Sequence, residues 1–207
     1  EKVIKENEMI EKPEKRKSGA QFDKITVIVL TEINQLLKIP APLIKQMALK
    51  NIARPTPIQV QGIPALFAGR DVIGIAFTGS GKTLTFLMPM IMHALEEEMN
   101  FPLEGGDGPI GLVLCPSREL ARQTHENLEH LLAAFETTHG REKNKDENQY
   151  PSIRSTLVVG GEDKIQQCST ARNQGVHCIV ATPGRMNDLL NRNQLHLDVC
   201  KYLVLDE

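Results

Sequence analysis

Residues 76–83 read AFTGSGKT, and they stand between a short apolar run at residues 72–76 and an amphipathic stretch at residues 82–97. A glycine-rich loop between a strand and a helix is the setting in which backbone N–H groups surround phosphate oxygens. The glycines let the backbone turn inward, Lys82 supplies a positive charge, and Thr83 offers a hydroxyl to magnesium. We therefore predict a phosphate-binding loop. The alternative, a turn that only caps a helix, leaves the Lys82 charge at a helix amino terminus, where it is unfavourable.

Apolar runs and helical patterns alternate along the chain on both sides of this loop. The unbroken apolar runs indicate strands that are buried on both faces, and they lie at residues 72–76, 111–115, 156–159, 178–181 and 202–205. Helical patterns lie at residues 82–97, 118–135, 164–173 and 185–192. This alternation predicts an α/β fold with a mainly parallel sheet and helices on both of its faces. Residues 100–109 and 136–150 have the composition of surface loops.

Composition excludes several other classes of protein. The 207 residues are 41% hydrophobic and 24% charged with a net charge of −2, which suits a globular chain with one core. The near-neutral balance argues against nucleic-acid binding by bulk charge, so such binding needs a local patch. The four cysteines form no Cys-x-x-Cys pair, so a zinc site is not expected. No apolar run reaches the roughly 18 residues that a membrane span needs, and we expect no membrane association.

Two acidic residues, Asp206 and Glu207, follow the last apolar run. Parallel sheets bind ligands beyond the carboxyl ends of their strands, which is where the phosphate loop also lies. Asp206 can then join Thr83 in holding magnesium, and Glu207 can orient or deprotonate an attacking water. In the plainer interpretation the two acids only begin a loop; we prefer the catalytic one because a phosphate loop is present.

Several short segments, taken together in order and spacing, resemble the first RecA-like domain of DEAD-box RNA helicases over about residues 34–207. They are Pro55–Gln59, Ala76–Thr83, Pro116–Ala121, Gly160–Gly161, Thr182–Arg185 and Leu205–Glu207. Residues 74–83 and 115–125 look most like the Abstrakt-type branch, a nuclear group tied to pre-mRNA splicing. Asn51 and Ile52 stand where the family usually has Gly-Phe.

The resemblance implies a RecA-like fold that binds ATP and Mg²⁺. Lys82, Asp206 and Glu207 would be the catalytic residues, with Thr83 and Asp206 at the metal and Gln59 reading the adenine edge. The residues implied at the nucleotide are Arg54, Pro55, Thr56, Gln59, Thr78, Gly79, Ser80, Gly81, Lys82 and Thr83. The residues implied along single-stranded RNA are Pro116, Arg118, Gly161, Thr182, Gly184 and Arg185. Glycine allows a close backbone approach, and arginine and threonine bind phosphate and sugar without reading sequence.

We expect three parts: a charged extension at residues 1–24, a flanking segment with a helix at residues 25–56, and an incomplete RecA-like domain at residues 57–207, which stops at the acidic motif. By resemblance the partners are single-stranded RNA or a short duplex, a second RecA-like domain and ribonucleoprotein components. The whole enzyme would be a monomer that couples ATP hydrolysis to RNA unwinding or ribonucleoprotein remodelling. Its expected location is the nucleus, with the cytoplasm as a second location. This piece alone should unwind nothing. The competing hypotheses are a catalytically inactive module that binds RNA or protein and, ranked last, a small-molecule kinase.

Overall fold

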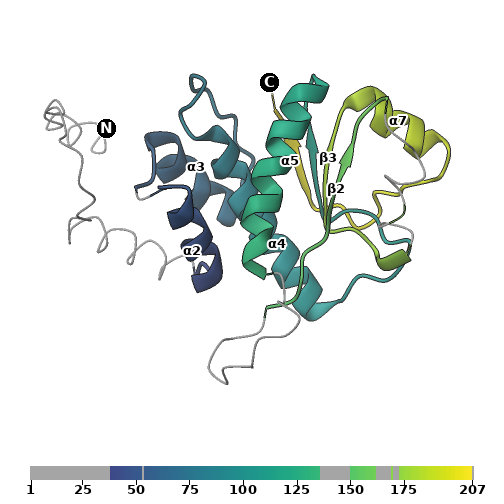
Figure 1. Cartoon of the computed structure of the whole chain (residues 1–207), viewed down its shortest axis with the longest axis horizontal. Helices are drawn as coiled ribbons and strands as arrows, with labels where there is room; N and C mark the ends of the chain where they lie inside the picture. The colour runs from purple at the N-terminus through teal and green to yellow at the C-terminus, as the bar shows by residue number, and fades with distance from the viewer. Residues whose placement is uncertain (1–37, 53, 136–149, 162–168, 170–172, 207) are drawn as a thin grey trace, which may run out of the picture.

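The computed structural model describes residues 38–52, 54–135, 150–161, 169 and 173–206, which form a parallel sheet with helices on both faces (Figure 1). The strands of the sheet are β1 (Gly111–Leu114), β2 (Ser155–Val158), β3 (Cys178–Ala181) and β4 (Tyr202–Leu205). Their order is β2-β3-β1-β4, and every pair is parallel. Leu112 of β1 pairs with Ile179 on one side and Leu203 on the other. The predicted α/β class with a mainly parallel sheet is confirmed.

Helices cover the sheet from two sides because successive side chains of a strand point to opposite faces. The helices are α2 (Ala41–Leu49), α3 (Pro57–Phe67), α4 (Lys82–Asn100), α5 (Arg118–Leu132) and α7 (Pro183–Asn191), with a 3₁₀ turn, η1, at Ala133–Phe135. Val113 and Val180 are buried in a core cluster with residues of α2, α4 and α5. Leu112 and Ile179 are buried in a second cluster with residues of α7. The two faces of the sheet are thus buried against different helices.

Local sequence explains how the sheet and helices meet. Ser117 begins α5 as its N-cap, and its hydroxyl accepts a hydrogen bond of 3.2 Å from the Leu120 N–H. Gly111 begins β1 where α4 passes closely: a Cβ there would lie 2.4 Å from the Cγ of Met90. The glycine therefore sets the distance between α4 and the sheet.

The structure differs from the expected elements in two places. Residues 72–76 are not a strand: Ile73 and Ile75 are 92% and 91% exposed, and the segment has no place in the sheet of the described residues. An apolar run has the side chains that a buried strand needs, but a strand also needs a neighbouring strand with which its backbone can form hydrogen bonds. Helix α3 was not expected, because it contains Pro64, a residue type that usually ends a helix, and because its apolar residues do not form one stripe. Most of the expected helix at residues 164–173 lies outside the described residues.

A polar cluster lies at the end of the sheet opposite the predicted phosphate loop. His177, which is fully buried, meets the Glu98 carboxylate of α4 with 2.8 Å between its Nε2 and Oε2. Its Nδ1 accepts a hydrogen bond of 3.0 Å from the Arg154 N–H. The same Glu98 oxygen accepts a hydrogen bond of 2.9 Å from the Leu103 N–H. The cluster thus ties the last turn of α4 to the starts of β2 and β3.

Within the described residues, no helix is both long and apolar enough to cross a membrane.

Candidate functional site

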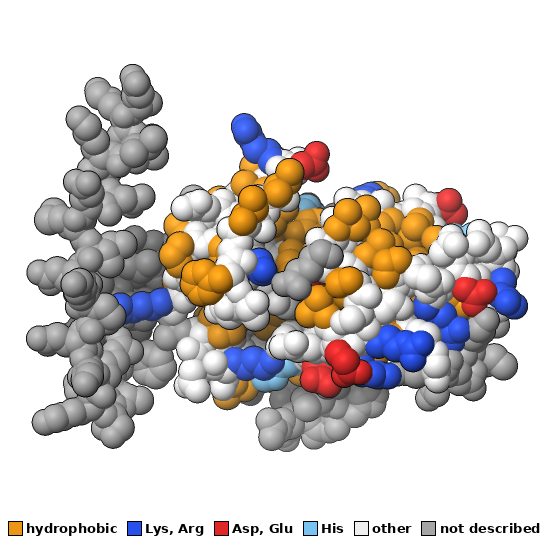
Figure 2. All heavy atoms as spheres, turned by 90° about the horizontal axis from the view of Figure 1, so that it is seen from above, with side chains coloured by type: hydrophobic (Ala, Val, Ile, Leu, Met, Phe, Trp, Pro, Cys, Tyr) orange, Lys and Arg blue, Asp and Glu red, His pale blue; other side chains and the backbone are white. Residues whose placement is uncertain are grey.

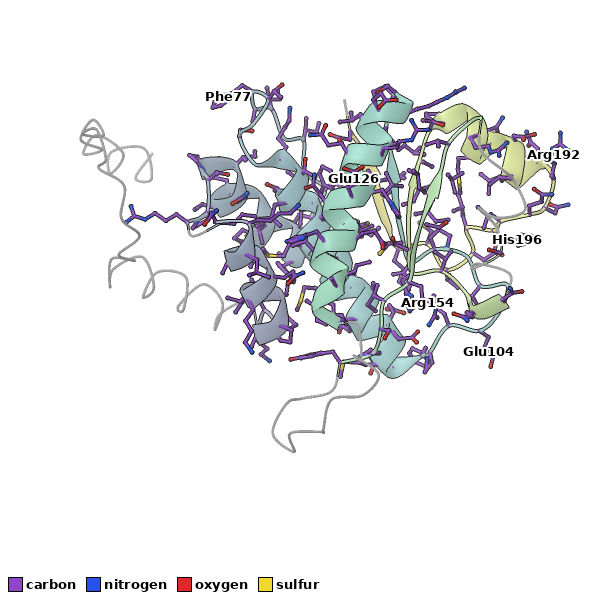
Figure 3. The ribbon with its side chains drawn as sticks, viewed as in Figure 1. Phe77, Glu104, Glu126, Arg154, Arg192 and His196 are labelled. Atoms are coloured by element: carbon purple, nitrogen blue, oxygen red, sulfur yellow. The ribbon has the colours of Figure 1, made fainter. Side chains whose placement is uncertain are left out.

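The predicted phosphate loop is a bend that leads directly into α4. The Ser80 N–H donates to the Phe77 carbonyl over 3.2 Å, and Gly79 and Gly81 have φ of 82° and 94°. These left-handed conformations favour glycine, as the sequence predicted. Phe77 lies at the tip of the loop, away from the sheet (Figure 3). The bend therefore presents its backbone at the amino end of a 19-residue helix.

Lys82 is the first residue of α4, and the first turn of α4 has no acidic side chain. A positive charge at this end of a helix is unfavourable unless an anion lies beside it. The Lys82 ammonium donates a hydrogen bond of 2.8 Å to the carbonyl of Ala76 in the preceding segment. The charge, the helix dipole and the bend together favour an anionic ligand here.

Gln59 connects the segment around Pro55 to the phosphate loop. Its side chain is 5% exposed, its Nε2 donates to the Gly81 carbonyl over 3.1 Å, and its Oε1 accepts from the Thr56 N–H over 3.0 Å. A Cβ on Gly81 would lie 2.4 Å from the Gln59 Nε2, so only glycine fits beside the amide. The amide that the family resemblance assigns to adenine thus also holds the phosphate loop against α3.

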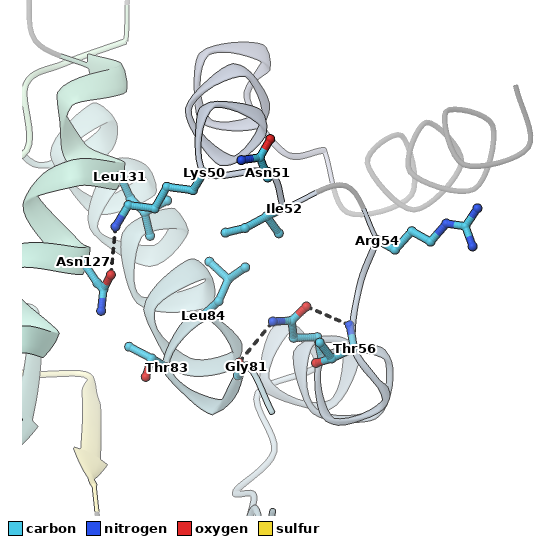
Figure 4. Close-up of a pocket in the computed structure, with 11 residues that line it drawn as sticks. Lys50, Asn51, Ile52, Arg54, Thr56, Gly81, Thr83, Leu84, Asn127 and Leu131 are labelled. Carbon is cyan, nitrogen blue, oxygen red and sulfur yellow. Dashed lines mark hydrogen bonds between the residues drawn. The ribbon is translucent and has the colours of Figure 1, made fainter. Parts of the chain in front are cut away.

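A pocket of about 350 Å³ lies beside this amide (Figure 4). Its lining includes five of the residues predicted at the nucleotide and six further residues: Arg54, Thr56, Gln59, Gly81, Thr83, Lys50, Asn51, Ile52, Leu84, Asn127 and Leu131. The Lys50 ammonium donates to the Asn127 Oδ1 over 2.9 Å across the pocket, whereas the Arg54 side chain points away from it (Figure 4). Sequence reasoning missed Lys50 and Asn127, because they stand in no motif and meet only through packing of α2 against α5.

A larger cavity, of about 850 Å³, brings Lys82 and Asp206 together. Asp206 is held by its N–H, which donates to the Leu114 carbonyl at the end of β1 over 2.9 Å. Thr83, the other predicted magnesium ligand, lines the 350 Å³ pocket instead, so the metal pair is divided between two neighbouring hollows. Glu207 lies outside the described residues.

The Asp206 carboxylate also acts on Cys115, which ends the β1 segment. Burial, together with the negative charge of Asp206, raises the pKa of the Cys115 thiol to about 11. The thiol therefore stays protonated at neutral pH, and it has none of the thiolate character that a nucleophile needs.

The residues predicted along RNA gather around a third cavity, of about 410 Å³. Its lining contains five of the six predicted residues and two more: Pro116, Arg118, Thr182, Gly184, Arg185, Gly160 and Asp188. The sixth, Gly161, has φ of 89°, and a Cβ there would lie 3.1 Å from the Arg118 guanidinium. The positive φ favours glycine at this position, and the missing side chain lets the Arg118 guanidinium lie close against the backbone.

Two helices begin at this third cavity. Ser117 is the N-cap of α5 and Thr182 is the N-cap of α7, so the amino ends of both helices face the same hollow. Arg185 lies 3.8 Å from the Asp188 carboxylate, which leaves Arg118 and the helix ends to favour an anion. The arrangement suits phosphate groups and offers little for reading bases.

The comparisons with known proteins agree with this arrangement. The family profile described as DEAD/DEAH box helicase matches residues 56–207. The chain belongs to the DEAD/DEAH box helicase family. This confirms the resemblance found in the sequence.

Several DEAD-box helicases are similar over most of the chain. DEAD-box ATP-dependent RNA helicase 35 of Arabidopsis thaliana is 52% identical over 171 residues, which is 83% of this chain and 27% of that protein. ATP-dependent RNA helicase abstrakt of Drosophila melanogaster is 48% identical over 83% of this chain and 26% of its own length. The RNA helicase Prp28 of Chaetomium thermophilum, solved bound to ADP, matches with a TM-score of 0.66 and 32% identity over 83% of this chain and 37% of that one. The chain thus spans about a quarter of the length of these curated relatives.

Proposed function

We propose that this chain is the ATP-binding domain of an ATP-dependent RNA helicase, and that it binds Mg²⁺-ATP and single-stranded RNA along the carboxyl edge of its sheet. The observation that carries the proposal is the single cavity that holds Lys82 and Asp206 beside the glycine bend. A bound triphosphate needs a positively charged side chain and a divalent metal ion close together. Lys82 would supply the positive charge, and the Asp206 carboxylate would hold the metal ion.

The donor set of the site fits a magnesium nucleotide. Carboxylate and hydroxyl oxygens are ligands that suit Mg²⁺, and Asp206 and Thr83 would hold it from the two neighbouring hollows that they line. Bound Mg²⁺ would neutralise charge on the phosphates. Lys82 would exchange the Ala76 carbonyl for a phosphate oxygen, and the Gln59 amide would face the base from a position braced against Gly81.

The whole enzyme's activity is part of the same proposal. A second RecA-like domain would complete the nucleotide cleft, and the cavity around Arg118 would hold one strand of RNA by its phosphates. The similarity to ATP-dependent RNA helicase abstrakt supports ATP-dependent activity on RNA. The Abstrakt-type resemblance of residues 74–83 and 115–125 leads us to propose unwinding or ribonucleoprotein remodelling in pre-mRNA splicing, and a nuclear location.

Titration of a fluorescent ATP analogue in Mg²⁺ tests the proposal. Lys82→Ala removes a charge-assisted contact to phosphate, so we expect affinity to fall about 10- to 100-fold. Lys201→Ala is the matched control, because Lys201 lines the same cavity but its ammonium pairs with Glu97 at 2.7 Å. We expect the control to bind like the wild-type chain. Equal binding by Lys82→Ala and wild type, with RNA binding indifferent to nucleotide, would favour the inactive module instead.

A further inference from the structure

One wall of the pocket beside Gln59 consists of residues to which the proposed function assigns no role. Lys50 is the C-cap of α2 and Asn127 lies within α5, and the Lys50 ammonium donates to the Asn127 Oδ1 over 2.9 Å. Both residues line the pocket of about 350 Å³ that also contains Gln59. A pocket of this size suits a small organic ligand. The wall is therefore placed to contact the base of a bound nucleotide.

The end of α2 fixes the place of Lys50. Asn51 follows it with φ of 56°; the Asn51 N–H donates to the Ala48 carbonyl over 2.9 Å, and the Ile52 N–H donates to the Met47 carbonyl over 3.1 Å. These two bonds are those of a Schellman helix end, where asparagine can replace glycine in the left-handed position. Ile52 also packs against the core cluster that contains Met47. Lys50 therefore stands on a fixed backbone, and its side chain extends to Asn127 (Figure 4).

Asn127 is fixed from the other side of the pocket. Leu128 and Leu131 of the same helix are buried in the core, which sets the direction of the Asn127 amide. A lysine side chain is long and flexible, so the Asn127 oxygen is needed to hold its ammonium in one place. On the face that Figure 2 shows, the described Lys and Arg side chains lie in separate groups among hydrophobic and uncharged ones. We therefore interpret the Lys50 ammonium as one local hydrogen-bond donor, not as part of a broad basic surface.

The Gln59 amide still has the capacity to bind a base. Its Nε2 uses one N–H for the Gly81 carbonyl, and its Oε1 uses one lone pair for the Thr56 N–H, so one donor and one acceptor are left. This pair matches N7 and the 6-amino group of adenine. A base held in this way turns its opposite edge, which carries C2 and N3, away from Gln59. Figure 4 shows the Lys50–Asn127 bond at one end of the pocket and Gly81 and Thr56 toward the other.

The chemistry of a lysine decides which base suits this second edge. Adenine has an acceptor at N3 and only a hydrogen atom at C2, whereas guanine has an amino group at C2. An ammonium group donates hydrogen bonds and accepts none, so it can bind N3 but leaves a neighbouring amino group without an acceptor. Gln59 cannot detect the group at C2, because the 6-amino group and N7 lie on the other edge. Lys50 thus supplies a second, independent criterion for the base.

We propose that Lys50, positioned by Asn127, is a specificity-determining residue that excludes purine nucleotides with an amino group at C2. The inference rests on the proposed function, because it needs an adenine nucleotide in the pocket beside Gln59. Gln59 would select the 6-amino group of the base, and Lys50 would reject the 2-amino group. The two contacts together would distinguish ATP from GTP at both edges of the base.

Isothermal titration calorimetry with ATP and with 2-amino-ATP, each in Mg²⁺, tests the inference. The two nucleotides differ only by the amino group at C2, so the Gln59 contact is the same for both. We expect the wild-type chain to bind 2-amino-ATP at least about tenfold more weakly than ATP. Lys50→Met keeps the long apolar stem but loses the ammonium, and it should bring the two affinities within about threefold of each other. Lys45→Met is the matched control, because Lys45 is on the same helix but is not among the residues that line the pocket.

The outcomes separate this inference from the proposed function. Equal affinity of the wild-type chain for the two nucleotides overturns the inference and leaves the proposed function standing, whereas failure to bind ATP overturns both. A Lys50→Met variant that still discriminates as strongly as Lys45→Met overturns the role of Lys50. Asn127→Ala should also reduce the discrimination, and Asn127→Asp should retain it, because aspartate keeps an acceptor for the ammonium. Full discrimination by Asn127→Ala would overturn the positioning role of Asn127.

Discussion

Replacing Glu98 by alanine should destabilise the fold by removing one carboxylate oxygen that two donors share. The Oε2 of Glu98 accepts from the Leu103 N–H and lies 2.8 Å from the Nε2 of His177. The His177 ring is fully buried, so its N–H would lose its acceptor without gaining water. An unsatisfied buried donor costs about 1–3 kcal/mol, and the more exposed Leu103 bond contributes about 1 kcal/mol. We expect Glu98→Ala to lower the free energy of unfolding by about 2–4 kcal/mol.

Glu98→Gln is the matched control. Its amide oxygen can take the place of Oε2 and accept both bonds, so the variant loses only the negative charge, which assists these bonds and lies 3.8 Å from the Arg154 guanidinium; we put this loss at about 1 kcal/mol. Urea unfolding followed by far-UV circular dichroism measures both variants against wild type. Because a whole domain is stabilised by only about 5–15 kcal/mol, the alanine effect is a large change in midpoint. Equal midpoints for the two variants, or an alanine variant as stable as wild type, would refute this account of the cluster.

Two further predictions concern pH and RNA. Burial lowers the pKa of His177, so the unfolded ring, with its pKa of about 6.5, gains a proton at a higher pH than the folded ring does; stability is full above that pH and falls as pH decreases below it. A His177→Gln variant should lose this part of the pH dependence in urea titrations between pH 7 and 5, and an unchanged slope would contradict the assignment. Arg118→Ala should weaken binding of single-stranded RNA equally for all sequences and reduce the slope of log affinity against log salt by about 1. Arg122→Ala on the same helix, where Arg122 pairs with Glu119, is the control; loss of affinity only for some sequences would contradict a phosphate contact.

Much of the sheet could be predicted from the sequence because burial on both faces demands unbroken apolar runs. The runs that became β1, β3 and β4 agree with the structure to within a residue. The same reasoning failed for residues 72–76, because an apolar run says nothing about which edge remains available to it. Helix α3 was not predicted, because Pro64 in its sequence is unfavourable inside a helix. Its packing against α4 stabilises the helix nevertheless.

The site divides in the same way into local and non-local parts. The bend at Gly79 and Gly81 was readable because left-handed backbone favours one residue type, and the structure shows that conformation at both. The contact between Lys50 and Asn127 could not be predicted from the sequence, because the two residues are 77 positions apart and neither belongs to a motif. The roles of all these residues toward ligands remain predictions that the binding experiments address.

The end of β1 fixes the distance between the proposed nucleotide and RNA cavities. The Leu114 carbonyl accepts from the Asp206 N–H over 2.9 Å, and the next N–H, of Cys115, donates to the Ala181 carbonyl over 2.8 Å. Asp206 lines the cavity of Lys82, and Ala181 leads directly into the Thr182 cap of the RNA cavity. Two consecutive residues therefore hold both cavities through backbone hydrogen bonds that side-chain changes leave in place. This one peptide therefore joins the strand that leads to Asp206 to the strand that leads to Thr182, so a displacement of β4 would reach the RNA cavity by a short physical route.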